Sequence, residues 1–251
     1  MGQAFARGLS DRDLAVVVSD PSIEKIQYLE DMGINITDNN EEAIKTAEIV
    51  IIAVKPGMVE NVLQALKFNE NQLVMSIAAG IKTEQIMKWA DAEKVVRVMP
   101  NTPALVGYGM SVWVCSESVT DDEKLGIQQL LATVGDEVEL EDEDLMNSVT
   151  AISGSGPAYV FYFLEAMAQL GEELGLEKEV VDKLAIKTFI GASMLAQVSQ
   201  DDFLTLRQRV TSKGGTTEAA LNVMDEAGMK KTFMDAMRKA AERSEELSGE
   251  N

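Results

Sequence analysis

Short apolar runs rich in β-branched residues alternate with amphipathic stretches over the first 115 residues, and this alternation restricts the fold more than any other feature. Because each run is nearly continuously apolar, we expect strands that are covered by helices on both faces. The pattern predicts successive β-α units that form a mostly parallel, doubly wound sheet. The predicted strands cover residues 14–18, 49–54, 73–77, 95–99 and 110–114.

Strand patterns disappear after about Met146, and the rest of the chain has only helical periodicity. We therefore expect an α/β domain over residues 1–146, followed by an all-helical domain over residues 147–251. Within the first domain, residues 22–32 and 121–133 also have helical spacing, and Gly33 stands where a helix commonly ends. The helices predicted in the second domain cover residues 159–174, 178–198, 204–210, 217–225 and 229–247.

Charge and the rare residue types exclude several classes of function. With 42 acidic against 22 basic residues, the net charge of −20 repels nucleic acid and anionic membranes, so we expect neither as a partner. A single cysteine excludes an internal disulfide and indicates a reducing compartment. The absence of histidine removes Ser-His triads and most transition-metal sites, so we expect no metal. No long apolar segment is present, and we predict a cytoplasmic protein.

Several loops that follow predicted strands have the composition of a dinucleotide site, because open α/β sheets bind ligands at the carboxyl ends of their strands. Asp20 could bind a ribose hydroxyl, and Gly2 opens a small-residue helix as the last glycine of a Gly-x-Gly-x-x-Gly turn would. Ordinary turns, caps and close packing are the alternative interpretations. The other candidates in these loops are Ala53, Val54, Lys55, Pro56, Ala78, Ala79, Met99 and Asn101.

Two segments of the helical half combine glycine with hydroxyl residues just before a predicted helix. They cover residues 153–159 and 211–217. Backbone N–H groups at a helix start can hold a small anion such as a carboxylate, although simple N-capping would use the same residues. Consecutive glycines at 214–215 favour the anion interpretation for the second loop, because capping does not require their entropic cost. The acidic run 139–144 lacks the ligand spacing of a calcium loop, and a solvated charge run is the simpler interpretation.

Taken in order, these segments closely resemble the pyrroline-5-carboxylate reductase family. The matching motifs are Ala-Val-Lys-Pro at 53–56, Ser-Ile-Ala-Ala-Gly at 76–80, Arg-Val-Met-Pro-Asn-Thr-Pro at 97–103, Ser-Gly-Ser-Gly-Pro-Ala-Tyr at 153–159 and Val-Thr-Ser-Lys-Gly-Gly-Thr-Thr at 210–217. Each motif is modest alone, but the ordered set is specific and spans essentially the whole chain.

The resemblance implies an N-terminal Rossmann domain and a C-terminal helical domain that forms a homodimer or a higher assembly of dimers. It also implies the last step of proline biosynthesis. In that step NAD(P)H gives a hydride to the C=N carbon of 1-pyrroline-5-carboxylate, a cyclic imine, and L-proline is formed. Such an acceptor needs mainly positioning and electrostatic stabilisation, which a protein without histidine can provide.

The family roles can be carried over residue by residue. The resemblance places Ser212, Gly214, Gly215, Thr216 and Thr217 around the substrate, and it makes the Thr217 hydroxyl the nearest group to a catalytic side chain. It also aligns Glu143 with a substrate-contacting position. Asn40 joins the residues that line the cofactor.

Three departures from the family pattern have consequences. Lys213 replaces the usual proline, which loosens the loop and adds a positive charge. Asp20 would repel a 2′-phosphate, so we predict NADH over NADPH. The family's first strand and first glycines do not precede Gly2, and we expect Met1 to be an internal methionine of a protein about ten residues longer.

Two alternative functions stay open. One is a different reductase with the same architecture, such as a β-hydroxyacid dehydrogenase, for which we find no matching active-site lysine. The other is a truncated, catalytically impaired dimer that binds no dinucleotide.

Overall fold

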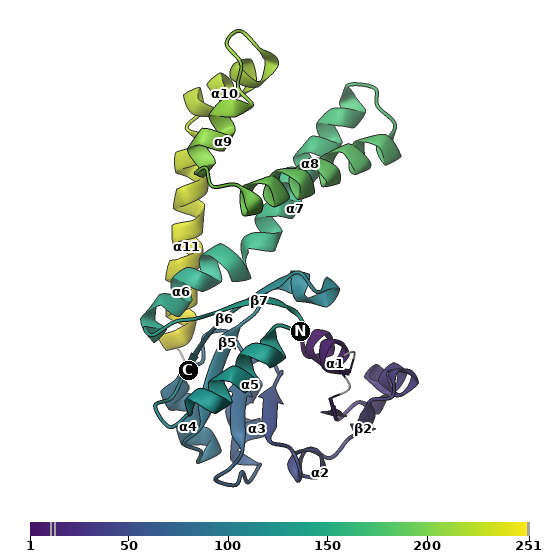
Figure 1. Cartoon of the computed structure of the whole chain (residues 1–251), viewed down its shortest axis with the longest axis vertical. Helices are drawn as coiled ribbons and strands as arrows, with labels where there is room; N and C mark the ends of the chain where they lie inside the picture. The colour runs from purple at the N-terminus through teal and green to yellow at the C-terminus, as the bar shows by residue number, and fades with distance from the viewer. Residues whose placement is uncertain (11, 13, 250–251) are drawn as a thin grey trace. The chain divides into compact units, whose positions relative to one another are not determined.

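The computed structural model describes residues 1–10, 12 and 14–249. They form two compact units (Figure 1). The sheet unit comprises residues 1–157 together with the chain from residue 239 onward, and the helical unit comprises residues 158–238. The change in sequence pattern predicts a different division, into domains 1–146 and 147–251. This division stays a prediction.

The strands of the sheet unit lie in two sheets. β1 (Val17–Ser19) and β2 (Asn35–Thr37) form a parallel pair. The larger sheet has the order β3-β4-β5-β6-β7, in which only the β5–β6 pairing is antiparallel, and no ladder joins the two sheets within the described residues. Its strands are β3 (Ile49–Ile52), β4 (Leu73–Ser76), β5 (Val95–Met99), β6 (Gly109–Cys115) and β7 (Gly135–Glu139).

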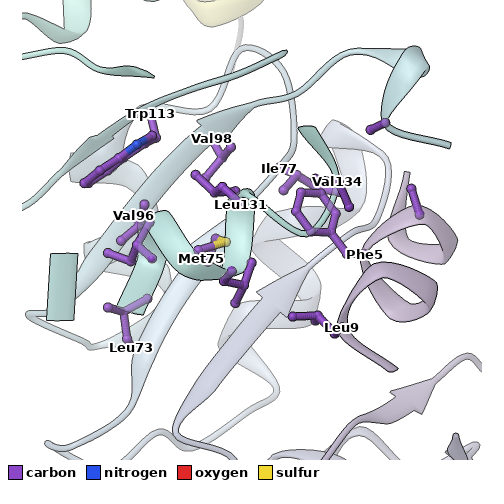
Figure 2. Close-up of a cluster of buried hydrophobic side chains, with 14 of the residues drawn as sticks. Phe5, Leu9, Leu73, Met75, Ile77, Val96, Val98, Trp113, Leu131 and Val134 are labelled. Carbon is purple, nitrogen blue, oxygen red and sulfur yellow. The ribbon is translucent and has the colours of Figure 1, made fainter. Parts of the chain in front are cut away.

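Helices cover both faces of the larger sheet. Each strand contributes side chains to the core on both faces, because its alternate residues point to opposite sides. Leu73 and Met75 of β4 pack in the cluster that includes Phe5 and Leu131 (Figure 2). Val74, between them, packs in a second cluster with side chains of α3 and α4. The α-helices of this unit are α1 (Gly2–Ser10), α2 (Asn40–Ile44), α3 (Val59–Gln64), α4 (Thr83–Ala90), α5 (Asp121–Leu131) and α6 (Met146–Val149).

Shorter helical turns join these elements. They are η1 (Ile23–Lys25), η2 (Gln27–Met32), η3 (Pro56–Met58), η4 (Thr102–Val106), η5 (Glu143–Leu145) and the π-helical turn η6 (Thr150–Gly154).

The second half of the chain is helical, as the periodicity predicts. The helices are α7 (Gly156–Glu173), α8 (Lys178–Val198), α9 (Phe203–Arg209), α10 (Thr216–Glu226) and α11 (Met229–Gly249). The last residues of α11 belong to the sheet unit, where Ser244 Oγ donates a hydrogen bond of 2.8 Å to Asn147 Oδ1. None of the helices in the described ranges is long and apolar enough to cross a membrane.

Some elements of the sheet unit differ from those that the sequence predicts. The single helix predicted over 22–32 is wrong, because the chain forms two short 3₁₀ helices, η1 and η2, before Gly33 ends the segment at φ 76°. The strand predicted over 14–18 is shorter and shifted, at Val17–Ser19. β2 and β7 were not predicted, because Asn-Ile-Thr is very short and Gly-Asp-Glu-Val-Glu is mostly polar.

Candidate functional site

Three of the predicted cofactor loops end at one edge of the larger sheet. β3, β4 and β5 run parallel to one another, so their carboxyl ends lie on the same side. The loops that follow these strands contain Ala53–Pro56, Ala78 with Ala79, and Asn101, in that order, and Met99 is the last residue of β5 itself. The structure therefore brings these candidates to the edge where open α/β sheets bind ligands.

Gly2 lies against the same edge, as the first residue of α1. A Cβ atom built on Gly2 would be 3.0 Å from the Cβ of Ala53, which is tighter than ordinary van der Waals contact. The first turn of a helix leaves backbone N–H groups without helical partners, and such a turn can receive a phosphate. The absence of a side chain at Gly2 therefore lets α1 pack closely against the end of β3.

Lys55 and Pro56 shape the loop after β3. Lys55 has extended backbone angles and precedes η3, whose first residue is Pro56. Proline is favoured there, because the first helical residue needs no N–H donor. Ala53, Lys55 and Pro56 are exposed, whereas Val54 is half-buried against the core. This loop thus presents a cation and small side chains at the sheet edge.

Asp20 and Asn40 both lie near the end of β1. Ser19, the last residue of β1, donates from its hydroxyl to Asn40 Oδ1 at 2.7 Å, and Asn40 opens α2. Asp20 directly follows Ser19, and its Oδ1 accepts a hydrogen bond of 2.8 Å from the Ser22 N–H. The carboxylate is held by its own turn at a strand end, the position at which acidic residues bind a ribose in dinucleotide folds.

Asn101 connects the loop after β5 to the π-helical turn η6. Its Oδ1 accepts from the Met110 N–H at 2.9 Å, and its Nδ2 donates to Ser153 Oγ at 3.3 Å. A Cβ on Gly154 would overlap the end of the Met99 side chain. The motifs around 99–101 and 153–156 are therefore adjacent, although the sequence places them some 50 residues apart.

Glu143 has a different environment from the one that its predicted role implies. Both of its carboxylate oxygens accept hydrogen bonds inside the sheet unit, from Thr83 and from Arg97. Its predicted contact with substrate stays a prediction. Sequence reasoning missed Arg97 and Thr83 as members of this cluster. The available signal was the arginine within the apolar strand Val-Val-Arg-Val-Met, because a buried guanidinium requires a partner.

The glycine-rich segment 211–217 joins α9 to α10 in the helical unit. Gly214 has φ 72°, a left-handed conformation that favours glycine, and a side chain on Gly215 would meet Ser212. The Gly214 N–H donates to Glu218 Oε2 at 2.7 Å, while Thr216 and Thr217 are the first two residues of α10. Ser212, Gly214, Gly215, Thr216 and Thr217 thus form one turn at a helix start. They belong to the helical unit and the cofactor candidates to the sheet unit.

Cys115, the one thiol, lies at the end of β6 and is half-buried. Burial raises the pKa of the Cys115 thiol, the nearby Lys124 ammonium opposes this, and the Glu139 carboxylate adds to it. The thiol is therefore protonated at neutral pH and a poor nucleophile. No three acidic or thiol side chains in the described ranges gather closely enough to hold a metal ion.

Fold and loops together define a dinucleotide-dependent oxidoreductase with a Rossmann-like domain followed by helices. Among curated relatives, the pyrroline-5-carboxylate reductase of Pseudomonas aeruginosa is 39% identical over 92% of this chain and 86% of its own length. That of Pisum sativum is 34% identical over 99% of this chain and 93% of its own. The chain belongs to the pyrroline-5-carboxylate reductase family.

Family models and solved structures agree with this assignment. The model for pyrroline-5-carboxylate reductase dimerisation matches residues 143–247, and one described as "NADP oxidoreductase coenzyme F420-dependent" matches residues 1–80. The reductase structure from Coxiella burnetii has a TM-score of 0.88 at 33% identity, covering 98% of this chain and 94% of its own. The Plasmodium falciparum pyrroline carboxylate reductase with NADP bound has a TM-score of 0.90 at 29% identity, covering 99% and 94%.

Membership of the pyrroline-5-carboxylate reductase family confirms the predicted fold class and activity. The protein is an NAD(P)H-dependent oxidoreductase of proline biosynthesis that acts on a cyclic imine, and its helical part is the family's dimerisation domain. The protein is accordingly a homodimer.

Proposed function

We propose that this chain reduces 1-pyrroline-5-carboxylate to L-proline with the residues that the family motifs single out. The observation that carries the assignment is the placement of three motif loops and Gly2 at one sheet edge. When bound, NAD(P)H would supply a hydride to the C=N carbon and become NAD(P)⁺, and the π-electron pair of that bond would move to the protonated ring nitrogen.

The proposed cofactor residues divide by the part of the dinucleotide that they suit. The first turn of α1 at Gly2 suits the pyrophosphate. Asp20 and Asn40 suit the ribose distal to the nicotinamide, because Asp20 follows the end of β1 and Asn40 accepts a hydrogen bond from Ser19, the last residue of that strand. The remaining residues line the sheet edge with small or flexible groups; they are Ala53, Val54, Lys55, Pro56, Ala78, Ala79, Met99 and Asn101.

The proposed substrate site is the turn 212–217. Backbone N–H groups of Gly215 and Thr216 and the Ser212 hydroxyl would bind the substrate carboxylate, since the N-terminus of α10 favours an anion. The Gly215 N–H donates to the Ser212 carbonyl oxygen at 3.0 Å in this structure, so it would have to exchange this partner for the carboxylate. Lys213 adds a positive charge to the same turn. The Thr217 hydroxyl would contact the ring nitrogen, orient the imine and accompany its proton.

We further propose that NADH is preferred over NADPH. Asp20 carries a negative charge at the end of β1, and a 2′-phosphate placed beside it would be repelled. A ribose 2′-hydroxyl can instead donate a hydrogen bond to this carboxylate. We also propose a cytoplasmic location, based on the single cysteine.

The direct test follows absorbance of the reduced nicotinamide while the chain is mixed with NADH and 1-pyrroline-5-carboxylate. Loss of NADH that depends on both substrate and protein, with proline as product, is the expected result. A chain that neither oxidises NADH nor gains thermal stability from it would instead be the impaired dimer, because a ligand that binds the folded state raises its melting temperature.

A further inference from the structure

Glu143 holds together three segments that are far apart in the sequence. It is the first residue of η5, and its Oε2 accepts from the Thr83 hydroxyl at 2.6 Å. Its Oε1 accepts both from the Thr83 N–H at 2.8 Å and from Arg97 Nη1 at 2.9 Å. One carboxylate therefore satisfies three donors, two on the first residue of α4 and one on β5.

The two partners of Glu143 stand at the two ends of the same loop. Thr83 opens α4, directly after residues 77–82. Arg97 is paired in the sheet with Ser76, the last residue of β4, from which that loop departs. The connection between β4 and α4 is therefore tied at its beginning through Arg97 and at its end through Thr83.

The loop between these ties is short and tightly packed. Ile77, Ala78 and Ile81 are buried, and the Ala78 N–H donates to Ser76 Oγ at 3.3 Å. Gly80 is buried with φ 75°, a conformation that favours glycine, and a Cβ there would be in ordinary van der Waals contact with the backbone of Leu247 near the end of α11. The segment has little room to change shape unless one of its ties is released.

The ion pair between Arg97 and Glu143 is more buried than an ordinary surface ion pair. The Arg97 side chain is 5% exposed and that of Glu143 is 23% exposed. A buried guanidinium is costly without a hydrogen-bonded counter-charge, and a charge-assisted contact is geometrically more specific than a neutral one. The cluster is suited to fixing the position of the loop.

We propose that Glu143 is a positioning residue for the reduced-nicotinamide cofactor: through Thr83 and Arg97 it holds the β4–α4 loop, with Ala78 and Ala79, in its binding conformation. This inference rests on the proposed assignment of Ala78 and Ala79 to the cofactor. It assigns Glu143 a role toward the cofactor instead of the predicted contact with substrate.

Thr83→Val is the decisive variant, because it removes one donor to Glu143 but keeps side-chain volume and the Glu143–Arg97 ion pair. We expect the dissociation constant for NADH, measured by calorimetry without substrate, to rise about tenfold, within the losses that small misplacements cause. Backbone amides of residues 77–83 should exchange hydrogen faster, and the KM for 1-pyrroline-5-carboxylate should stay within about twofold. Thr83→Ser, which keeps the hydroxyl, should restore the NADH dissociation constant and the exchange rates to the wild-type values.

Two further variants complete the design. Glu143→Gln should weaken NADH binding at least as much as Thr83→Val. If Glu143→Gln fails to fold because Arg97 loses its counter-charge, the comparison of Thr83→Val with Thr83→Ser tests the proposal. Glu141→Gln makes the same change at an exposed neighbour and should behave as the wild type.

Contrary outcomes separate the inference from the proposed function. Unchanged NADH affinity in Thr83→Val overturns the positioning role, as does a rise confined to the KM for 1-pyrroline-5-carboxylate, which would make Glu143 a substrate ligand. Ala79→Val tests the cofactor assignment itself. If it leaves NADH affinity unchanged, the assignment and the inference both fail; if it weakens binding while Thr83→Val does not, only the inference fails.

Discussion

Thr217 is the one side chain to which we assign a part in the chemistry, as the second residue of α10 in the turn 212–217. Thr217→Val keeps the shape but removes the hydroxyl. We expect kcat to fall about 100-fold, in the range that loss of one positioned hydrogen-bonding group at the reacting centre causes. The KM for 1-pyrroline-5-carboxylate should change little, because the carboxylate contacts remain. Thr217→Ser should recover most of the rate in the same steady-state assay, and a Val variant with wild-type kcat would exclude the role.

Asp20 is the residue to which we assign the preference for NADH over NADPH. Asp20→Ser removes the negative charge and keeps a hydrogen-bonding group for the Ser22 N–H. We expect the ratio of kcat/KM for NADPH to that for NADH to rise at least about tenfold, because a charge–charge repulsion of more than 1 kcal/mol is removed. Parallel titrations with both cofactors measure it. A wild type that already prefers NADPH would contradict our interpretation of Asp20.

At the scale of elements, the pairing of β6 with β7 depends on two facing glycines. Gly135 has φ 146° and lies opposite Gly109 in the ladder, where any Cβ would overlap the Gly109 carbonyl oxygen. Gly135→Ala therefore both strains the backbone and separates the strands. We expect a loss of about 3 kcal/mol or more in the free energy of unfolding, measured with urea.

A matched control for this substitution lies in the neighbouring helix. Gly126 is within α5, and a Cβ there meets nothing within 4 Å. Gly126→Ala should stabilise the protein by about 0.5–1 kcal/mol, because alanine restricts the unfolded chain and favours helix. Equal effects of the two substitutions would contradict the close approach of β6 and β7.

At the scale of the whole molecule, the helical unit exposes many large apolar side chains, and a contiguous apolar surface of this kind marks a site of association. Phe161, Tyr162, Leu184, Met194 and Phe203 are each more than half exposed. A homodimer accounts for such side chains, because obligate interfaces resemble a divided core. We therefore expect many of the exposed apolar residues of α7 and α8 to be buried between protomers.

Leu184→Glu tests this expectation. Its side chain is 54% exposed on α8, so the free chain should tolerate the charge, whereas a buried interface should not. We expect monomers by light scattering and a loss of activity. Leu125→Glu, at 55% exposure on α5 of the sheet unit, is the matched control and should leave the dimer intact. A Leu184→Glu protein that stays dimeric would place the interface elsewhere.

The sequence alone determined the elements whose stability is local or whose burial is complete. β5 coincides with the apolar run at 95–99 and α8 with the periodic stretch 178–198, since side-chain pattern alone specifies both. The ordered motifs also identified the family. Sequence pattern could not predict β2, β7 or the 3₁₀ turns within 22–32. Short or polar segments take their conformation from neighbouring elements.

Only the tertiary structure decided which side chains meet. Sequence reasoning placed Glu143 by resemblance, yet its partners Thr83 and Arg97 lie 60 and 46 residues away. The same holds for Gly2 against Ala53 and for Asn101 against Ser153. Periodicity records which face of an element is buried, but not which distant element covers it. Those contacts follow from the order in which the strands pair, and from the packing that this order imposes.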